Sequence, residues 1–483
     1  MELGRIRKFN AGLIVAAAVC AAVLSSTAAT ARADVQLHRL FSTGAVLQQG
    51  MRVPIFGTAA VGEAVSVRIQ DQEGQTNADA EGNWRIEVGP LKPGGPFVLT
   101  VGGDKRLTVN NVFVGEVWVC AGGTNMQSPV INADGYGSVM TNSANQQLRL
   151  YMLKREGSVT PRTTTDVPWI QAGAASVGGF SAVGYYFGRG IAKSQNVPVG
   201  LISCNNYLSS IESWISKPAL EGSPTLKKAL DKPISHIDLK SPTVIFNGMV
   251  NPITQYAVRG VLWYHGEGSL EAAYQYREAL PLLIADWRKH WKQPNLPFLI
   301  VQLAPNKVPI KVMAESKLAE LRESQLLAAK QTPNTALIVI TDHGDPYDIH
   351  PRQKEPVGQR LALAAESMVY GGKAEYRGPM FASANFSKGQ ALLRFQNVGG
   401  GLMAKGDELK GFFVAGADRV FYEGKAVIEG DGVVVTSTQV PNPEAARYGW
   451  ADFPQGNLFS KEGLPASPFR TDNYPLLTSP AAE

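Results

Sequence analysis

The sequence predicts an α/β protein with a parallel β-sheet at its centre and short β-strands at both ends. Three observations predict this. Residues 34 to about 111 alternate apolar and polar side chains, residues 112–371 alternate apolar strands with helices, and the chain after residue 372 returns to short strands between glycines. Strands that are apolar throughout and separated by helices are typical of a parallel sheet covered on both faces.

The first 33 residues have the form of a cleavable export signal. Arg5, Arg7 and Lys8 precede an apolar run over residues 11–24, and residues 31–33 read Ala-Arg-Ala, an A-x-A cleavage site. The alternative is a retained N-terminal anchor, but the apolar run is short for a membrane-spanning helix. We therefore expect a secreted or periplasmic mature protein that begins at Asp34.

The charge of the mature chain excludes several classes of partner. Removing residues 1–33 lowers the formal net charge from +5 to +2, and no run of basic residues remains. We therefore expect neither nucleic acid nor a membrane surface as a partner of the mature form. Two cysteines remain, Cys120 and Cys204, and each ends an apolar run, so that a disulfide and two buried thiols are both open. The oligomeric state is also left open.

The N-terminal region, residues 34–111, is expected to form a small β-sandwich. Residues 65–69 and 84–88 alternate with a period of two, and Gly62, Gly74 and Gly82 separate the strands. Carbohydrate binding and packing against the next domain are both compatible with such a unit.

The central region, residues 112–371, is expected to be the catalytic domain. Its predicted strands are Val112–Cys120, Val199–Cys204, Gly260–Tyr264, Phe298–Leu303 and Ala336–Thr341, and its predicted helices are Ala182–Lys193, Leu270–Trp291, Met313–Lys330 and Pro356–Val369. Ligands of such sheets bind beyond the carboxyl ends of the strands. The loops after Cys120, Cys204, Tyr264 and Thr341 should therefore meet at one edge.

The C-terminal region, residues 372–483, returns to β-structure. Its predicted strands are Ala391–Phe395, Gly411–Val414, Arg419–Tyr422 and Gly432–Thr436. The closing stretch, residues 447–472, is rich in proline and aromatic residues. Because this stretch is too apolar for a free tail, we expect it to pack on the body of the protein.

The loops of the central domain hold the residues of an ester-hydrolysing site. Such a reaction needs a nucleophile, a base, a carboxylate that orients the base and donors for the oxyanion. The apolar strand that ends at Cys120 leads into a small-residue turn that presents Thr124, a hydroxyl, and Asn125, an amide. His350 follows the last strand, and Asp348 lies two residues before it, within reach of its imidazole.

Several blocks in order resemble the bacterial sialate O-acetylesterases, which belong to the SGNH/GDSL-like hydrolases. The turn over residues 117–127 is similar to the family's V-W-L-C-S-G-Q-S-N-M, residues 260–269 to G-V-I-W-Y-Q-G-E-S-N, and residues 342–362 to the histidine block, in which Asp348 and His350 match the catalytic pair. The resemblance covers the whole mature chain. It implies an SGNH-type parallel sheet with flanking helices, an acetylated sugar or sialoglycan as substrate, and no cofactor.

The resemblance also implies the roles of the site residues. Thr124 stands at the nucleophile position, His350 would be the base and Asp348 its orienting carboxylate. The backbone N–H of Thr124 and the side chain of Asn125 would serve the oxyanion. Gly123, Asn125, His265 and Glu267 together form the expected oxyanion- and substrate-binding set, although a structural hydrogen bond for Glu267 and simple space-filling for His265 stay open.

The departures from the family pattern cluster at the site. Thr124 replaces a serine, Gly123 and His265 replace glutamines, Ser269 replaces an asparagine, and two glycine positions hold residues 207 and 208, a tyrosine and a leucine. Two hypotheses follow: an esterase with weakened activity, or a glycan-binding descendant of the fold without catalysis. The pair Asp342-His343 has no third ligand at a suitable spacing, so no metal site is expected.

Overall fold

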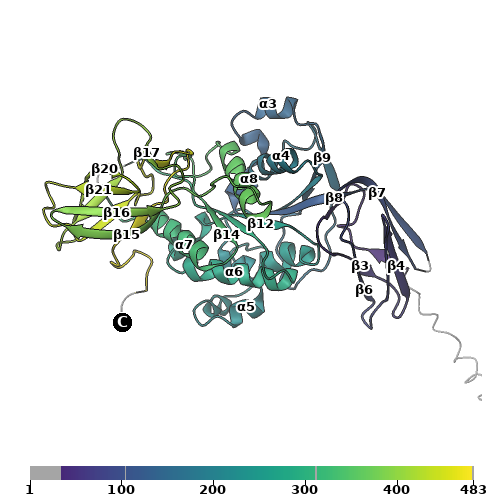
Figure 1. The fold of residues 1–483 in the computed structure, drawn as a ribbon. Helices are drawn as coiled ribbons and strands as arrows, with labels where there is room; N and C mark the ends of the chain where they lie inside the picture. Colours follow the sequence, from purple (N-terminus) through teal and green to yellow (C-terminus); the bar gives the residue numbers. More distant parts are fainter. Residues whose placement is uncertain (1–33, 104, 310–312, 481–483) are drawn as a thin grey trace, which may run out of the picture.

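The computed structural model describes residues 34–103, 105–309 and 313–480. The expected export signal lies outside these residues. Two β-regions lie at opposite ends of a central α/β body, the N-terminal region in purple and the C-terminal region in yellow (Figure 1). Within the described ranges, no helix is long and apolar enough to cross a membrane.

The central body is built on a sheet with the strand order β10-β9-β11-β8-β12-β13-β14. All neighbouring pairs are parallel except β10 with β9, which is antiparallel. The bounds of these strands are β8 Arg106–Gly122, β9 Asn145–Met152, β10 Trp169–Ala172, β11 Val199–Asn205, β12 Gly260–Tyr264, β13 Phe298–Val301 and β14 Thr335–Ile338. The predicted α/β class is confirmed, and the five predicted strands are present, but β9 and β10 were missed.

Helices cover both faces of this sheet. In Figure 1, α4 and α8 lie on one side of the strands, and α6 and α7 lie on the other. The helices are α2 Thr124–Gln127, α3 Tyr136–Thr141, α4 Ala182–Gln195, α5 Lys217–Glu221, α6 Tyr276–Trp291, α7 Lys317–Gln331 and α8 Glu355–Val369. Short 3₁₀ turns are η1 Val130–Asn132, η2 Ile211–Trp214, η3 Lys227–Asp231, η5 Asn251–Ile253 and η6 Glu267–Ala272, and η4 Phe246–Val250 is a π-helical turn.

Two helices begin later than their apolar patterns predict. The predicted helix over residues 270–291 is divided into η6 and α6. The helix predicted from Met313 begins at Lys317, because Ser316 caps it and its Oγ accepts a hydrogen bond from the Ala319 N–H at 3.0 Å. Capping, rather than the apolar periodicity, therefore sets the start of α7.

The N-terminal region shares a strand with the central sheet. β8 pairs with β7 and β2 in its first part and with β11 and β12 in its second part. The other N-terminal strands are β1 Gln36–Leu37, β2 Val46–Gln48, β3 Val53–Thr58, β4 Ala64–Ile69, β5 Gln72–Asn77, β6 Asn83–Val88 and β7 Gly94–Gly102. The expected domain boundary at residues 111/112 lies inside β8, where Asn111 has a positive φ of 59°.

The C-terminal region consists of short antiparallel strands with a core of their own. The strands are β15 Met380–Ser387, β16 Gln390–Gln396, β17 Leu402–Ala404, β18 Phe412–Ala415, β19 Phe421–Glu423, β20 Lys425–Glu429, β21 Gly432–Thr436, β22 Ala445–Tyr448, β23 Leu458–Ser460 and β24 Phe469–Arg470. Trp450 of the closing stretch, together with Leu476 beyond it, clusters with Ala319 of α7.

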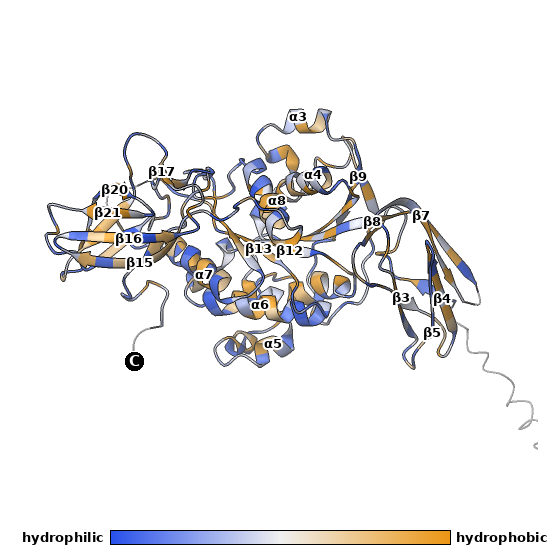
Figure 2. Cartoon of the chain, viewed as in Figure 1, coloured by the Kyte–Doolittle hydropathy of each residue, from blue (hydrophilic) through white to orange (hydrophobic). Residues whose placement is uncertain are grey.

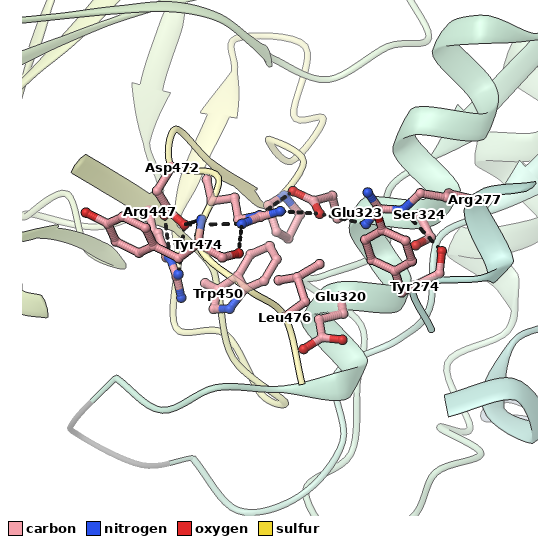
Figure 3. Close-up of polar contacts among 12 residues, drawn as sticks. Tyr274, Arg277, Glu320, Glu323, Ser324, Arg447, Trp450, Asp472, Tyr474 and Leu476 are labelled. Atoms are coloured by element: carbon pink, nitrogen blue, oxygen red, sulfur yellow. Dashed lines mark hydrogen bonds and ion pairs between the residues drawn. The ribbon is translucent and has the colours of Figure 1, made fainter. Parts of the chain in front are cut away.

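Ion pairs form within this region and between it and α7 (Figure 3). The Arg447 guanidinium donates to both oxygens of Asp472, at 2.7 and 3.0 Å, and both side chains are 1% exposed. Arg470 donates to Glu323 of α7 at 2.8 Å. Bidentate pairs of this kind fix orientation as well as contributing energy.

The core of the body is the central sheet and its helix contacts. β12 and β13 are buried along their whole length, and β13, whose residues are all apolar, is drawn in hydrophobic colours (Figure 2). Cys120 of β8 and Cys204 of β11 are both buried free thiols. Burial raises the pKa of each thiol, so both are held in the unreactive protonated form.

Candidate active site

A glycine turn brings the proposed nucleophile to the carboxyl end of β8. Gly122, the last residue of the strand, has a φ of 140°, and a Cβ there would lie 2.1 Å from the Tyr264 carbonyl oxygen. Only glycine fits so close to the end of β12. The next residue, Gly123, donates its N–H to the same carbonyl at 2.8 Å. The turn is therefore fixed against the neighbouring strand before α2 begins.

Thr124 is the first residue of α2 and lines a pocket of about 370 Å³. The other lining residues are Gln127, Ser128, Pro129, Ile131, Asn132, Asp348, His350 and Arg352. The structure therefore brings together three residues from loops more than 200 positions apart: Thr124, Asp348 and His350. The N–H groups in the first turn of a helix have no intrahelical acceptor, so that of Thr124 is available to a ligand.

Asp348 contacts His350 twice within the same loop. Its Oδ1 accepts the backbone N–H of His350 at 2.8 Å and lies 3.4 Å from the Nδ1 of the imidazole. Asp345 in turn accepts the backbone N–H groups of Tyr347 and Asp348, at 2.8 and 3.1 Å. This turn holds the Asp348 carboxylate beside Nδ1 of the His350 ring.

Asn125 is fully buried and connects the two loops. Its Nδ2 donates to Glu267 of η6 and to the carbonyl oxygen of Ile349, the latter at 3.0 Å. An amide nitrogen carries two hydrogens, and both are used in these bonds. In this arrangement neither is left for an oxyanion, which differs from the role expected from the resemblance. Each bond comes from a residue distant in sequence, which is why the sequence did not reveal it.

Three of the expected substrate-binding residues form a layer behind Thr124. Gly123, His265 and Glu267 do not line the pocket, and a Cβ on Gly123 would lie 3.7 Å from both His265 and Glu267. Burial raises the pKa of Glu267, although its hydrogen bond with Asn125 opposes the shift. Polar side chains therefore occupy the space beside Gly123, and this space is not part of the pocket.

His265 lies in a buried aromatic cluster. Its ring packs against Trp214, Trp263 and Tyr276, its Nε2 lies 3.1 Å from the Ser209 carbonyl oxygen, and its Nδ1 lies 3.2 Å from the Tyr276 hydroxyl. Burial lowers the pKa of His265 to about 4. The imidazole is therefore neutral at neutral pH, and both ring nitrogens are already engaged. These contacts favour the space-filling interpretation of this residue.

Lys354 is a further residue of the site to which the sequence analysis gave no role. It immediately precedes α8, is 1% exposed, and its Nζ donates to Asn125 Oδ1. Burial lowers the pKa of Lys354 to about 7, while Glu267 and Asp348 oppose the shift. Its position three residues before Val357, on the inner face of α8, is the signal that could have revealed its burial.

The two positions where the family has glycines lie at the end of β11. Tyr207 and Leu208 are 48% and 64% exposed, and Leu208 has a φ of 49°. The backbone therefore keeps the left-handed conformation that glycine favours although a leucine occupies it. The neighbouring Gly268 of η6 packs closely on this loop, since a Cβ there would lie 2.1 Å from the Ser209 carbonyl oxygen.

The pair Asp342-His343 is engaged elsewhere in the fold. Asp342 accepts two hydrogen bonds from the Arg360 guanidinium of α8, at 2.7 and 2.6 Å. His343 Nδ1 lies 3.0 Å from Gln353 Oε1. Within the part of the chain that the structure describes, no group of three or more histidine, cysteine or acidic side chains has a metal-binding arrangement.

The chain is similar to proteins of one known family. The family described as "Carbohydrate esterase, sialic acid-specific acetylesterase" matches residues 114–366. The chain is 28% identical to the human sialate O-acetylesterase over 362 residues, which cover 67% of this chain and 69% of that protein. It is 27% identical to the rat sialate O-acetylesterase over 382 residues, covering 66% of this chain and 68% of that protein.

A solved structure with the same fold is also similar in sequence. The carbohydrate acetylesterase XAC1771 from Xanthomonas citri superposes with a TM-score of 0.84 and is 36% identical, covering 91% of this chain and 100% of that chain. The family match and the similar structure define a carbohydrate esterase with an SGNH-type fold, as the sequence predicts. The chain belongs to the family of sialic acid-specific acetylesterases, whose members are carboxylic ester hydrolases.

Proposed function

We propose that this protein is an exported acetylesterase that removes O-acetyl groups from sialic acid or a related glycan sugar. The observation that carries the proposal is the shared pocket, which is lined by Thr124, Asp348 and His350. A volume of about 370 Å³ accommodates an acetylated sugar. Export is supported by the sequence of residues 1–33.

In the proposed reaction, Thr124 Oγ1 attacks the acetyl carbonyl while His350 Nε2 takes the hydroxyl proton. The tetrahedral intermediate collapses, the C–O bond to the sugar breaks, and His350 returns the proton to the sugar oxygen. Water, activated by His350, then releases acetate from Thr124. Asp348 orients the imidazole throughout by its contact with Nδ1.

Our proposal for the groups that bind the oxyanion differs from the one that the family resemblance implies. We propose that the backbone N–H of Thr124 is a donor and that Asn125 acts on the geometry of the site instead of on the oxyanion. A threonine nucleophile carries an extra methyl group that restricts χ1, so we expect slower turnover than with serine.

Substitutions of Thr124 and His350 test this function. We expect slow hydrolysis of p-nitrophenyl acetate and of O-acetylated sialic acid by the wild type, loss of at least about 100-fold in Thr124→Ala and His350→Ala, and a gain in Thr124→Ser. If wild type and Thr124→Ala hydrolyse these esters at equal rates, Thr124 is not the nucleophile.

The alternative is a glycan-binding protein without catalysis, motivated by Thr124 at the serine position and by Tyr207 and Leu208 at the glycine positions. Calorimetry with acetylated and unmodified sugars separates the two hypotheses. Binding without release of acetate favours the alternative, and acetate release that requires His350 favours the esterase.

A further inference from the structure

A buried lysine is joined to the turn that carries Thr124. Lys354 is 1% exposed, and its Nζ donates to Asn125 Oδ1. Because Oδ1 accepts from Lys354 Nζ, the amide of Asn125 is held in one orientation, with Nδ2 directed to Glu267 and to the Ile349 carbonyl.

Two of the residues that contact Asn125 lie on either side of the proposed base in the sequence. Ile349 immediately precedes His350, and Lys354 follows it by four residues. Both are bonded to the same side chain, that of Asn125, which immediately follows Thr124. One amide group therefore joins the turn that carries Thr124 to the histidine loop, residues 339–354.

Burying an ionisable amine between two loops costs stability. A charge removed from water destabilises a fold unless it is paired and hydrogen-bonded. The charged and titratable groups that face Lys354 are Glu267 of η6 and Asp348 of the histidine loop, and its Nζ lies 5.8 Å from the centre of the Tyr264 ring of β12. An apolar residue would fill the same space at lower cost, which points to a role in the site itself.

We propose that Lys354 is a positioning residue of the reaction: through Asn125 it holds the Thr124 turn at the distance and angle that attack beside His350 requires. Glu267 completes the arrangement by accepting from the same amide. Misplacement of reacting groups by about 1 Å can lower a rate by about 100-fold, so loss of this contact should act on turnover. The proposal rests on the proposed esterase function.

The test compares Lys354→Met with Lys193→Met, a matched substitution at an exposed position of α4. In Lys354→Met we expect kcat for p-nitrophenyl acetate to fall by about 10- to 100-fold with KM within about twofold. We also expect faster hydrogen exchange in residues 124–128 and 348–352. Lys193→Met should change none of these quantities, and Lys354→Arg, which keeps the cation, should recover part of kcat.

A folded Lys354→Met protein with wild-type kcat overturns the proposal. If this variant does not fold, the double variant Lys354→Met/Glu267→Gln removes both buried charges, and wild-type kcat in that protein overturns the proposal equally.

Failure of the proposed function has a different signature. If neither the wild type nor Thr124→Ser releases acetate from any ester tested, the esterase assignment fails. Hydrogen exchange then decides the role of Lys354: faster exchange of the two segments in Lys354→Met supports the positioning role, and unchanged exchange overturns it.

Discussion

The side-chain amide of Asn125 donates a hydrogen bond to the main-chain carbonyl of Ile349 at 3.0 Å. The residue after the proposed nucleophile is thus bonded directly to the residue before the proposed base, across 224 positions of sequence. Because the acceptor is a main-chain carbonyl, this bond between the two loops does not depend on the identity of the side chain at position 349.

The Asn125→Leu variant tests whether the bond between Asn125 and Ile349 contributes to turnover. The substitution keeps the branching at Cγ in a somewhat larger side chain and removes both donors and the acceptor, leaving the Ile349 carbonyl, Glu267 and Lys354 without this partner. We expect kcat for p-nitrophenyl acetate to fall by about 10- to 100-fold, because the histidine loop is no longer held beside Thr124. Asn142→Leu, at an exposed helix end, is the control. Equal kcat in wild type and Asn125→Leu would show that the bond does not matter for the reaction.

We expect the Leu208→Gly substitution not to lower the free energy of unfolding. Leu208 has a φ of 49° and is 64% exposed, so the substitution removes backbone strain of about 1–2 kcal/mol and loses little buried area. The greater entropy of an unfolded glycine costs about 0.5–1 kcal/mol in return. We expect the free energy of unfolding in urea to remain equal or to rise by up to about 1 kcal/mol. A clear loss of stability would mean that the leucine side chain makes contacts essential to the loop.

His265 should make the fold sensitive to acid. In the unfolded chain an imidazole binds its proton near pH 6.5, whereas burial lowers the pKa of His265 in the folded protein to about 4. Between these values the unfolded state binds more protons, so stability falls as the pH falls, by up to about 3 kcal/mol below pH 4.

The His265→Gln variant isolates this contribution from that of the carboxylates. Urea unfolding of both proteins at several pH values between 7 and 4 gives the difference in slope. We expect the variant, which has no group that titrates there, to lose less stability than the wild type over this range. Parallel curves would show that His265 is protonated in the folded protein as readily as in the unfolded chain.

Arg447→Met should destabilise the C-terminal region. The substitution removes the bidentate partner of the buried Asp472 and leaves Arg470, at 3.2 Å, as its remaining cation. Breaking a buried pair in this way costs about 3–5 kcal/mol. Calorimetry should show a lower unfolding temperature, and the double variant Arg447→Met/Asp472→Leu should recover part of the loss. A double variant that is less stable than Arg447→Met would contradict this account.

The sequence by itself determined the α/β class and the strands that carry the site. β8, β11 and β12 are apolar along the parts that lie in the sheet, and such runs between helices are recognisable without tertiary information. It also predicted that Thr124, Asp348 and His350 lie at one edge, because the carboxyl ends of parallel strands share an edge and these residues follow such ends. All three line one pocket.

The tertiary structure decided the rest. Only the second half of β9 is buried, so its pattern did not reveal a strand, and η6 interrupted a helix that the apolar residues alone predict to be continuous. The expected binding roles of Asn125 and His265 depended on which groups their polar atoms would meet. Those partners, Ile349 and Glu267 for one and Ser209 and Tyr276 for the other, come from other segments of the chain. A side chain offers the same donors and acceptors wherever it lies, and only the folded chain determines which of them remain free for a substrate.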